Sequence, residues 1–266
     1  MSKLSKIDTF PPKDYSKKAA KKELIEIQKK LMLFQRIMNA QDKYSMLLVL
    51  QGMDASGKDG VVRRIFSGLN PSGIKIHSFK APTAEERDHD FLRRVHAKTP
   101  NKWQITIFNR SHYEDILVPS VEWYLDKETI ARRYENINNF ESLLHDHKTV
   151  VIKCYLHMDR DVQLTNLQER LEDPIKHRKH NDGDRDSRAK WDSYMDVYEE
   201  VFDKTDTKDA PRHIIPSDDN RYKALTIAKI MLKAFESMDL KWPGLESDLD
   251  IDEILKLEGE KDEEEK

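Results

Sequence analysis

The 266-residue chain contains a single cysteine, few glycines and no long apolar run. Cys154 has no second cysteine in the chain to pair with, which fits a reducing compartment. It lies in the apolar segment 149–156, which favours a buried small side chain over a catalytic thiol. The longest aliphatic run, residues 46–50, is far shorter than the ~20 residues that a membrane span needs. With no apolar leader at the N-terminus, we expect a cytoplasmic protein without membrane association.

Charge is abundant but balanced: charged residues make up 36% of the chain, yet its net charge is −3. A near-neutral total argues against a nucleic-acid binder. No internal repeat or low-complexity linker divides the chain. We therefore expect a polar leader over residues 1–16, a single domain over residues 17–243, and a flexible acidic tail over residues 244–266.

Apolar periodicity indicates an α/β protein. Residues 17–41 are predicted to form a helix whose apolar stripe packs against the chain's own sheet or, alternatively, against a partner helix. Short β-type runs alternate with helical stretches, which predicts a mostly parallel sheet covered by helices on both faces. The expected strands are residues 44–51, 74–79, 104–108, 149–156 and 213–215. The expected later helices are residues 84–98, 128–145, 160–171, 187–204 and 222–238.

Residues 52–58, Gly-Met-Asp-Ala-Ser-Gly-Lys, match the first seven positions of the Walker A pattern between a predicted strand and a predicted helix. Backbone N–H groups of such a loop bind phosphate oxygens, and the lysine neutralises transferring charge. The expected phosphate-binding residues of the loop are Gly52, Ala55, Ser56, Gly57, Lys58 and Asp59. Asp59 replaces the usual Ser or Thr that ligates magnesium, so Asp54 is the candidate metal ligand, with a structural cap as the alternative.

A second polar cluster, residues 109–115, follows the predicted strand 104–108 at the sheet edge where ligands bind. The planar fork of Arg110 suits phosphate oxygens, which makes this residue a candidate phosphate clamp. A structural salt bridge between Arg110 and Asp115 or Glu114 is the alternative.

Together these motifs resemble those of the family-2 polyphosphate kinases. The resemblance lies in residues 50–60 and 108–114 and in shorter segments at 70–73, 78–82, 89–92 and 170–174, and it spans about residues 20–240. It implies a P-loop kinase of thymidylate-kinase-like fold, with three α/β/α layers, a parallel central sheet and a helical lid. It also implies transfer between inorganic polyphosphate and nucleotides with Mg²⁺, for which Mn²⁺ could substitute.

The resemblance assigns catalytic roles to Asp54, Lys58, Arg110 and Glu114, with Asp54 as the magnesium ligand. Asn109, Tyr113 and Glu114 are expected on the nucleotide side, and the pair Asn109 and Glu114 resembles the subgroup that accepts both AMP and ADP. Adenine nucleotides are the expected partners, with guanine nucleotides as an alternative. We further expect a homodimer or homotetramer.

Basic residues outside the two motifs are candidates for binding the phosphate chain. Lys80 is followed by the predicted helix 84–98, on which His89, Arg93 and His96 would share one face. Arg93 and Arg94 are the arginines of this helix expected at the phosphates, and a solvated charged helix is the alternative. Residues 174–190 are predicted to form a mobile lid, with a solvated linker as the alternative. The expected lid cations are Lys176, Arg178, Lys179, Arg185 and Arg188.

Two other functions use the same motifs. An ordinary ATP-dependent nucleotide or nucleoside kinase would share the loop and the fold. A non-catalytic nucleotide-binding protein would share the loop, but it would have no need for Asp54, Arg110 and Glu114 together. Asp218 and Arg221 lie in the turn after the last predicted strand. They are candidates for supporting the site, and the alternative is that they form a helix cap and a surface ion pair.

Overall fold

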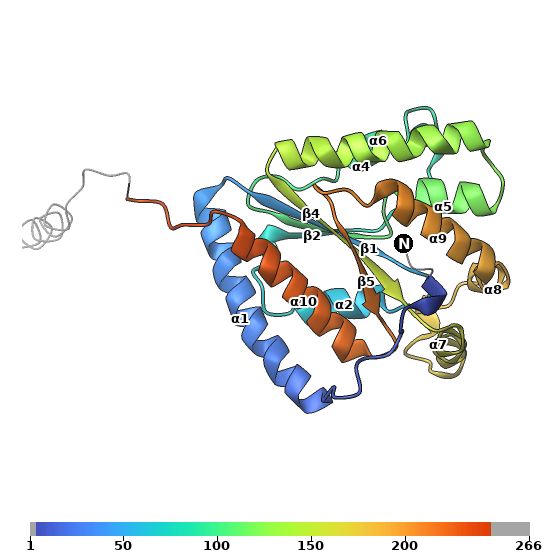
Figure 1. The fold of residues 1–266 in the computed structure, drawn as a ribbon, viewed down its shortest axis with the longest axis horizontal. Helices are drawn as coiled ribbons and strands as arrows, with labels where there is room; N and C mark the ends of the chain where they lie inside the picture. The colour runs from blue at the N-terminus through green and yellow to red at the C-terminus, as the bar shows by residue number, and fades with distance from the viewer. Residues whose placement is uncertain (1–3, 246–266) are drawn as a thin grey trace, which may run out of the picture.

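The computed structural model describes residues 4–245, and the acidic segment 246–266 of the predicted tail lies outside them. Five strands form one sheet in the order β2-β3-β1-β4-β5, with every neighbouring pair parallel (Figure 1). The strands are β1 (Ser45–Gln51), β2 (Ile74–His77), β3 (Ile105–Asn109), β4 (Thr149–His157) and β5 (Arg212–Pro216). The predicted parallel α/β architecture is therefore confirmed, and all five predicted strands are present.

Helices cover both faces of the sheet (Figure 1). One face carries α1 (Lys17–Gln41), α2 (Lys58–Phe66) and α10 (Asn220–Ser237), and the other carries α5 (Glu114–Val121), α6 (Lys127–Asp146) and α9 (Trp191–Thr205). Side chains of a strand alternate between faces. Accordingly, Leu48 of β1 packs in the cluster with α1 and α10, whereas Val49 packs in the cluster with α6 and α9. Both faces of β1 are buried, which explains its continuous apolar sequence.

The first helix begins at the residue predicted from the sequence. Ser16 caps it by accepting a hydrogen bond from the Ala19 N–H, and Asp42 ends it in the left-handed conformation. Leu31 and Met38 of the apolar stripe are fully buried against the chain's own core. The stripe therefore packs inside its own domain as expected, although its main neighbour is α10 rather than the sheet itself.

The predicted helix over residues 84–98 is wrong. The structure instead has two short helices, α3 (Ala84–Arg87) and α4 (Arg93–His96). Asp90 causes the interruption, because its carboxylate accepts hydrogen bonds from the N–H groups of Leu92 and Arg93 and so starts a new turn. His89, Arg93 and His96 therefore do not share one helical face.

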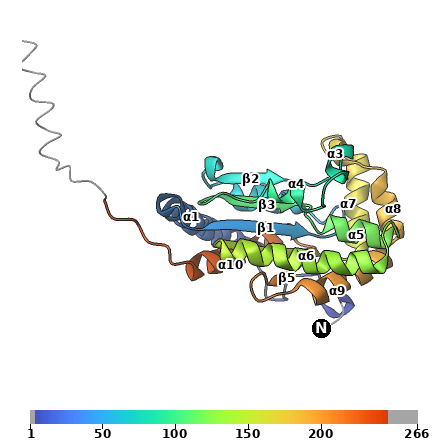
Figure 2. The same ribbon diagram turned by 90° about the horizontal axis from the view of Figure 1, so that it is seen from above.

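The lid region also differs from the expected arrangement. The segment predicted as one helix over residues 187–204 is divided at Lys190 into α8 (Gly183–Ala189) and α9. Before them lie α7 (Arg160–Glu172) and the short 3-10 helix η3 (His177–Lys179). Figure 2 shows α7 and α8 beyond the carboxyl ends of the strands, where α/β proteins bind their ligands.

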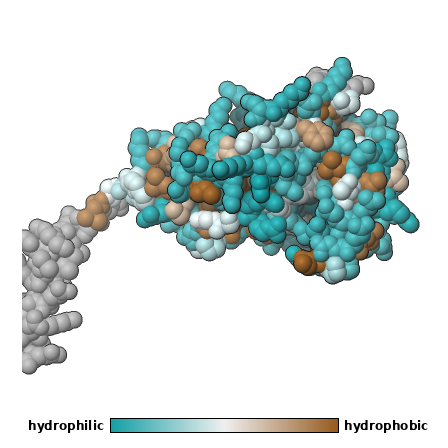
Figure 3. Space-filling view, turned by 90° about the horizontal axis from the view of Figure 1, so that it is seen from below, coloured by the Kyte–Doolittle hydropathy of each residue, from teal (hydrophilic) through white to brown (hydrophobic). Residues whose placement is uncertain are grey.

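The residues of the predicted leader contact the domain. Leu4 is buried in the core cluster, and its N–H donates to Glu199 Oε1 at 2.7 Å. The carbonyl of Thr9 accepts from the Asp218 N–H at 3.1 Å. On the face shown in Figure 3 the surface is mostly hydrophilic, with apolar residues in scattered spots. Within residues 4–245 no helix combines the length and apolar character that crossing a membrane requires.

Candidate active site

The Walker A segment forms a tight loop between β1 and α2. Its backbone enters the left-handed region at Gly52 (φ 141°), Ala55 (φ 66°) and Gly57 (φ 91°). A Cβ atom at Gly52 would lie 2.9 Å from the Leu156 carbonyl oxygen, so only glycine fits there. Lys58 is the first residue of α2, so the loop leads directly into a helix N-terminus, which favours anions.

Lys58 is held at the base of the loop. Its ammonium group donates to the carbonyl oxygens of Gly52 at 2.6 Å and Met53 at 3.1 Å. Burial lowers the pKa of Lys58, while the charges of Asp54 and Glu114 act to raise it. The structure therefore brings a cation and two carboxylates to one place.

Arg110 connects the second motif to the loop. It follows the last residue of β3 with a left-handed backbone (φ 72°), and its Nη2 lies 2.5 Å from Asp54 Oδ1. Burial acts to lower the pKa of Arg110, but the charges of Asp54 and Glu114 outweigh it and raise the pKa. The ion-pair partner of Arg110 is thus Asp54 and not Asp115 or Glu114, the alternatives from the sequence. Asp115 pairs instead with Arg94 at 2.9 Å.

Glu114 begins α5 and faces the same cavity as Lys58 and Arg110. Burial raises the pKa of its carboxyl, although Lys58 and Arg110 both act to lower it. The cavity has a volume of about 150 Å³. Asp54, Lys58, Arg110 and Glu114 all line it, so the structure brings the four predicted catalytic residues together.

Sequence reasoning missed several residues that line this cavity. They come from α5, the lid and α9: Val118, Asn181, Gly183, Ser187, Tyr194 and Tyr198. The predicted lid segment 174–190 is thus part of the cavity wall. Tyr194 and Tyr198 lie four residues apart on α9, a spacing that places them on one helical face but does not indicate which face meets the site.

The residues expected on the nucleotide side lie in different environments. Asn109 donates from Nδ2 to Asp59 Oδ1 at 2.6 Å, and the Asp59 carboxylate also lies 3.5 Å from Lys179 of the lid. Burial acts to raise the pKa of Asp59, but Asn109 and Lys179 hold the pKa below its usual value. Tyr113, also expected on the nucleotide side, is instead fully buried behind the turn and does not line the cavity.

The predicted basic residues also differ in position. Lys80 and Arg93 are exposed, whereas Arg94 is engaged with Asp115, Glu86 and the Lys80 carbonyl. Arg94 therefore joins α4 to α5 rather than facing solvent. Among the predicted lid cations Arg178 is exposed, Lys176 pairs with Glu169, Arg185 pairs with Asp186, and Arg188 donates to Gln163 and to the Arg160 carbonyl.

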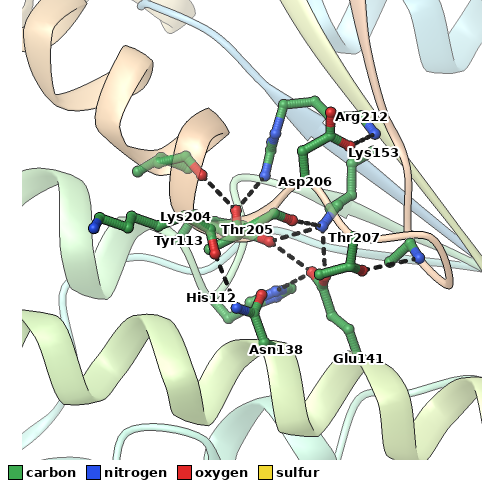
Figure 4. A network of polar contacts seen from close by, with 12 residues as sticks. His112, Tyr113, Asn138, Glu141, Lys153, Lys204, Thr205, Asp206, Thr207 and Arg212 are labelled. Atoms are coloured by element: carbon green, nitrogen blue, oxygen red, sulfur yellow. Dashed lines mark hydrogen bonds and ion pairs between the residues drawn. The ribbon is translucent and has the colours of Figure 1, made fainter. Parts of the chain in front are cut away.

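A buried polar network supports the second motif from behind (Figure 4). Glu141 of α6 accepts from Tyr113 Oη at 2.7 Å and lies 2.5 Å from the Lys153 ammonium of β4. Lys153 also donates to the Thr205 carbonyl at 2.6 Å, and the Arg212 guanidinium lies 4.8 Å from the centre of the Tyr113 ring. Because Tyr113 directly precedes Glu114, the network also holds in place the backbone from which Glu114 begins α5.

The groups of the network influence one another's ionisation. Burial lowers the pKa of Lys153 to about 8, against the attraction of Glu141. For Glu141, burial acts to raise the pKa, but the hydrogen bond from His112 and the charge of Lys153 hold the pKa below its usual value. The pair is therefore ionised at neutral pH. The sequence showed no such network, because its members come from four elements and from the turn before α5.

A parallel sheet with a phosphate loop after β1, and an arginine and two carboxylates converging on that loop, defines a P-loop kinase. The sequence model of the family "Polyphosphate kinase 2 (PPK2)" matches residues 14–243. The chain belongs to the polyphosphate kinase 2 family.

Individual relatives cover nearly the whole chain. An AMP/ADP-polyphosphate phosphotransferase of Meiothermus ruber is 39% identical over 243 residues, covering 90% of this chain and 91% of the relative. An ADP-polyphosphate phosphotransferase of Rhodopseudomonas palustris is 34% identical, covering 90% and 86%. The crystal structure of polyphosphate kinase 2 from Arthrobacter aurescens TC1 superimposes with a TM-score of 0.92 at 35% identity, covering 97% of this chain and 93% of that one.

Proposed function

We propose that the protein transfers phosphoryl groups from inorganic polyphosphate to AMP and ADP, reversibly between polyphosphate and ATP. The observation that carries this proposal is the meeting of Asp54, Lys58, Arg110 and Glu114 at one cavity beside the phosphate loop. The relative from Meiothermus ruber, whose name includes both AMP and ADP, supports the same choice of acceptors.

In this mechanism the loop and its cations bind the terminal phosphates of the donor chain. Phosphoryl transfer depends on alignment and on neutralising charge at the transferred group, because the protein performs little covalent chemistry. Lys58 supplies a point charge at the base of the loop, and Arg110, which follows β3, supplies a planar guanidinium group at the same cavity. Tyr194 and the lid residues close the cavity and limit the access of water.

The acidic residues of the site fit a magnesium ion that is carried by phosphates. Among the described residues no three potential metal ligands of the His, Cys, Asp or Glu type gather together. Mg²⁺ commonly takes one or two protein carboxylates and completes its shell with substrate phosphates and water, and Mn²⁺ accepts the same oxygen ligands. Asp54 would hold the ion, which would neutralise phosphate charge and align the two substrates.

Glu114 is proposed to act next to the attacking phosphate of the acceptor. Its burial beside Lys58 and Arg110 keeps a carboxylate close to the transferring group. Asn109, fixed on Asp59, is proposed to contact the nucleotide side. The cytoplasmic location and the homodimeric or homotetrameric state stay predictions.

The test is to incubate the purified protein with Mg²⁺ and long-chain polyphosphate, supply AMP or ADP in separate reactions, and follow the products by chromatography. We expect ADP and ATP from AMP, and ATP from ADP. The Lys58→Met variant should be folded and inactive, whereas Lys21→Met, on the exposed side of α1, serves as the matched control and should be fully active.

Three results would contradict parts of the proposal. If ATP forms in the reaction with ADP but no product forms in the reaction with AMP, AMP is not an acceptor. If the protein turns over with ATP as the phosphoryl donor but not with polyphosphate, it is an ordinary nucleotide kinase. Full activity of Lys58→Met would remove the phosphate loop from the mechanism. A preparation of Lys58→Met made in parallel controls for contaminating adenylate kinase, because a contaminant would be active in both samples.

A further inference from the structure

Three side chains from outside the phosphate loop hold three consecutive carbonyl groups of that loop. Gln163 donates from Nε2 to the Asp54 carbonyl at 3.0 Å, and Asn166 donates from Nδ2 to the Ala55 carbonyl at 3.2 Å. The ammonium group of Lys223 donates to the Ser56 carbonyl at 2.6 Å. Gln163 and Asn166 belong to α7, and Lys223 belongs to α10.

Two of these three side chains are buried, and both donate hydrogen bonds to carbonyl groups of the loop. Gln163 is fully buried, and Lys223 is 2% exposed. Burial lowers the pKa of Lys223 to about 8, with a further lowering by Arg64, so this lysine is still mostly charged at neutral pH. Burying a lysine and a glutamine is costly unless they make hydrogen bonds, so these contacts are a built feature of the fold.

Holding a carbonyl also orients the next N–H group. In a trans peptide the C=O of one residue and the N–H of the next point in opposite directions. The contacts of Gln163 with the Asp54 carbonyl and of Lys223 with the Ser56 carbonyl therefore direct the N–H groups of Ala55 and Gly57 away from α7 and α10.

Two other backbone groups of the loop are already used. The Ser56 N–H donates to the Met53 carbonyl at 3.2 Å, and the Gly57 carbonyl accepts from the Val61 N–H of α2 at 3.1 Å. Within residues 4–245, the N–H groups of Ala55 and Gly57 have no hydrogen-bond acceptor. These two donors are therefore free for an anion.

The loop needs such support because its conformation is strained. Ala55, a residue with a Cβ atom, has φ 66°, and left-handed conformations of such residues persist only where the surroundings hold them. Gly57 has φ 91°, and a Cβ atom there would lie 2.7 Å from Lys223 Nζ. The positive φ itself favours glycine at this position, and a side chain there would also displace the Lys223 ammonium group from the loop.

We propose that Gln163, Asn166 and Lys223 are positioning residues that hold the phosphate loop in its anion-binding conformation. This inference rests on the proposed function, in which the loop binds the terminal phosphates of the donor. None of the three touches the reacting atoms. They act through the peptide groups whose carbonyls they hold.

Gln163 also links the loop to the lid. Its side-chain oxygen accepts from Arg188 Nη1 of α8 at 3.0 Å, while its side-chain nitrogen donates to the Asp54 carbonyl. One amide group thus connects the residue that carries the proposed magnesium ligand with a helix of the lid. A displacement of α8 would release the oxygen of this amide and weaken its hold on Asp54.

The test uses neutral substitutions of similar shape. Gln163→Met, Asn166→Leu and Lys223→Met each remove the donor to the loop. Gln28→Met and Asn138→Leu are the matched controls, because Gln28 holds the Arg64 carbonyl at 2.8 Å and Asn138 holds the Lys204 carbonyl at 2.9 Å, both outside the loop. Thermal unfolding of every variant shows which are folded, and Lys223→Arg retains a donor if Lys223→Met does not fold.

For the three loop variants we expect kcat/KM for polyphosphate to fall about tenfold or more. Removing a hydrogen-bond donor that contacts the reacting group typically lowers the rate ~10²–10³-fold. A donor that is present but points in the wrong direction should lower the rate by a smaller factor. The KM for AMP or ADP should be unchanged, and Lys223→Arg should recover part of the loss. Calorimetric titration with inorganic tripolyphosphate should show weaker binding to the loop variants than to the two controls.

The inference is overturned if the folded loop variants bind tripolyphosphate as tightly as the controls and keep the same kcat/KM. It is also overturned if all variants lose activity only in proportion to their loss of folded protein. Should the wild type use ATP and not polyphosphate as its donor, the proposed function fails. The same comparison, made with ATP as the titrated donor, then still decides the role of the three residues.

Discussion

The buried ion pair between Lys153 and Glu141 allows a quantitative test of the structure. Replacing Lys153 with Met removes the ammonium group that lies 2.5 Å from the Glu141 carboxylate and leaves that carboxylate inside the core. Both side chains are about 1% exposed or less, so water cannot replace the lost partner. Removing one member of a fully buried pair typically costs about 3–5 kcal/mol of unfolding free energy.

We expect a cost at the lower end of that range, because Glu141 keeps the hydrogen bonds with Tyr113 and His112. For a domain of this size, a loss of 1 kcal/mol lowers the melting temperature by ~2–4 °C. The Lys153→Met variant should therefore melt about 10 °C below the wild type. Urea unfolding, with the midpoint and slope fitted together, measures the free energy itself.

A double-mutant cycle that combines Lys153→Met with Glu141→Gln measures the interaction free energy between the two side chains, apart from their contacts with other residues. The combined variant should lose less stability than the sum of the two single variants, because neither charge is then left alone. A loss below about 1 kcal/mol in Lys153→Met, or strict additivity in the double variant, would refute the reasoning. Both results would mean that the carboxylate is hydrated or displaced rather than buried.

The pH dependence of Glu141→Gln gives a further check. With its partner removed, the pKa of Lys153 should fall below about 8, while the unfolded chain keeps a pKa near 10.5. Between those values the unfolded state binds more protons than the folded state, so the stability of this variant should increase as pH rises through that window. Stability that falls with rising pH in the same window would contradict this assignment.

Two predictions concern the site itself. Arg110→Lys should lower kcat about 10²-fold with little change in melting temperature, because an ammonium group cannot reproduce the planar fork opposite Asp54; near-normal kcat would exclude the clamp. For Glu114, burial raises the pKa above 4.5, so the wild-type rate should fall as the pH drops through this raised pKa. Glu114→Gln should lose this acid limb of the pH–rate profile, and an unchanged limb would assign it to another group.

Much of the fold followed from local patterns. The strand, glycine loop and helix around residues 52–58 were predictable, because the loop spacing and the flanking periodicity occur within one short segment. The helix over residues 17–41 was equally clear from its apolar stripe. The break at Asp90 was missed, because a helical pattern continues on both sides and only the capping hydrogen bonds reveal the interruption.

The strand order and the surroundings of the site required the tertiary structure. Sequence patterns indicate a parallel sheet but not that β1 lies between β3 and β4, which brings Arg110 to Asp54. The resemblance led to the expectation that Tyr113 lies on the nucleotide side. In the structure Tyr113 lies in the core, where its hydroxyl donates a hydrogen bond to Glu141.

The sequence by itself determined the chemistry of the protein: a phosphate loop with a lysine, an acidic residue inside the loop, and an arginine and a carboxylate after β3. Only the tertiary structure showed what holds these groups in place. Gln163 and Lys223 contact loop carbonyls from positions more than 100 residues away in the chain. A bond to a backbone carbonyl needs only a donor in the right place, so it leaves no recognisable pattern of residue types around either partner.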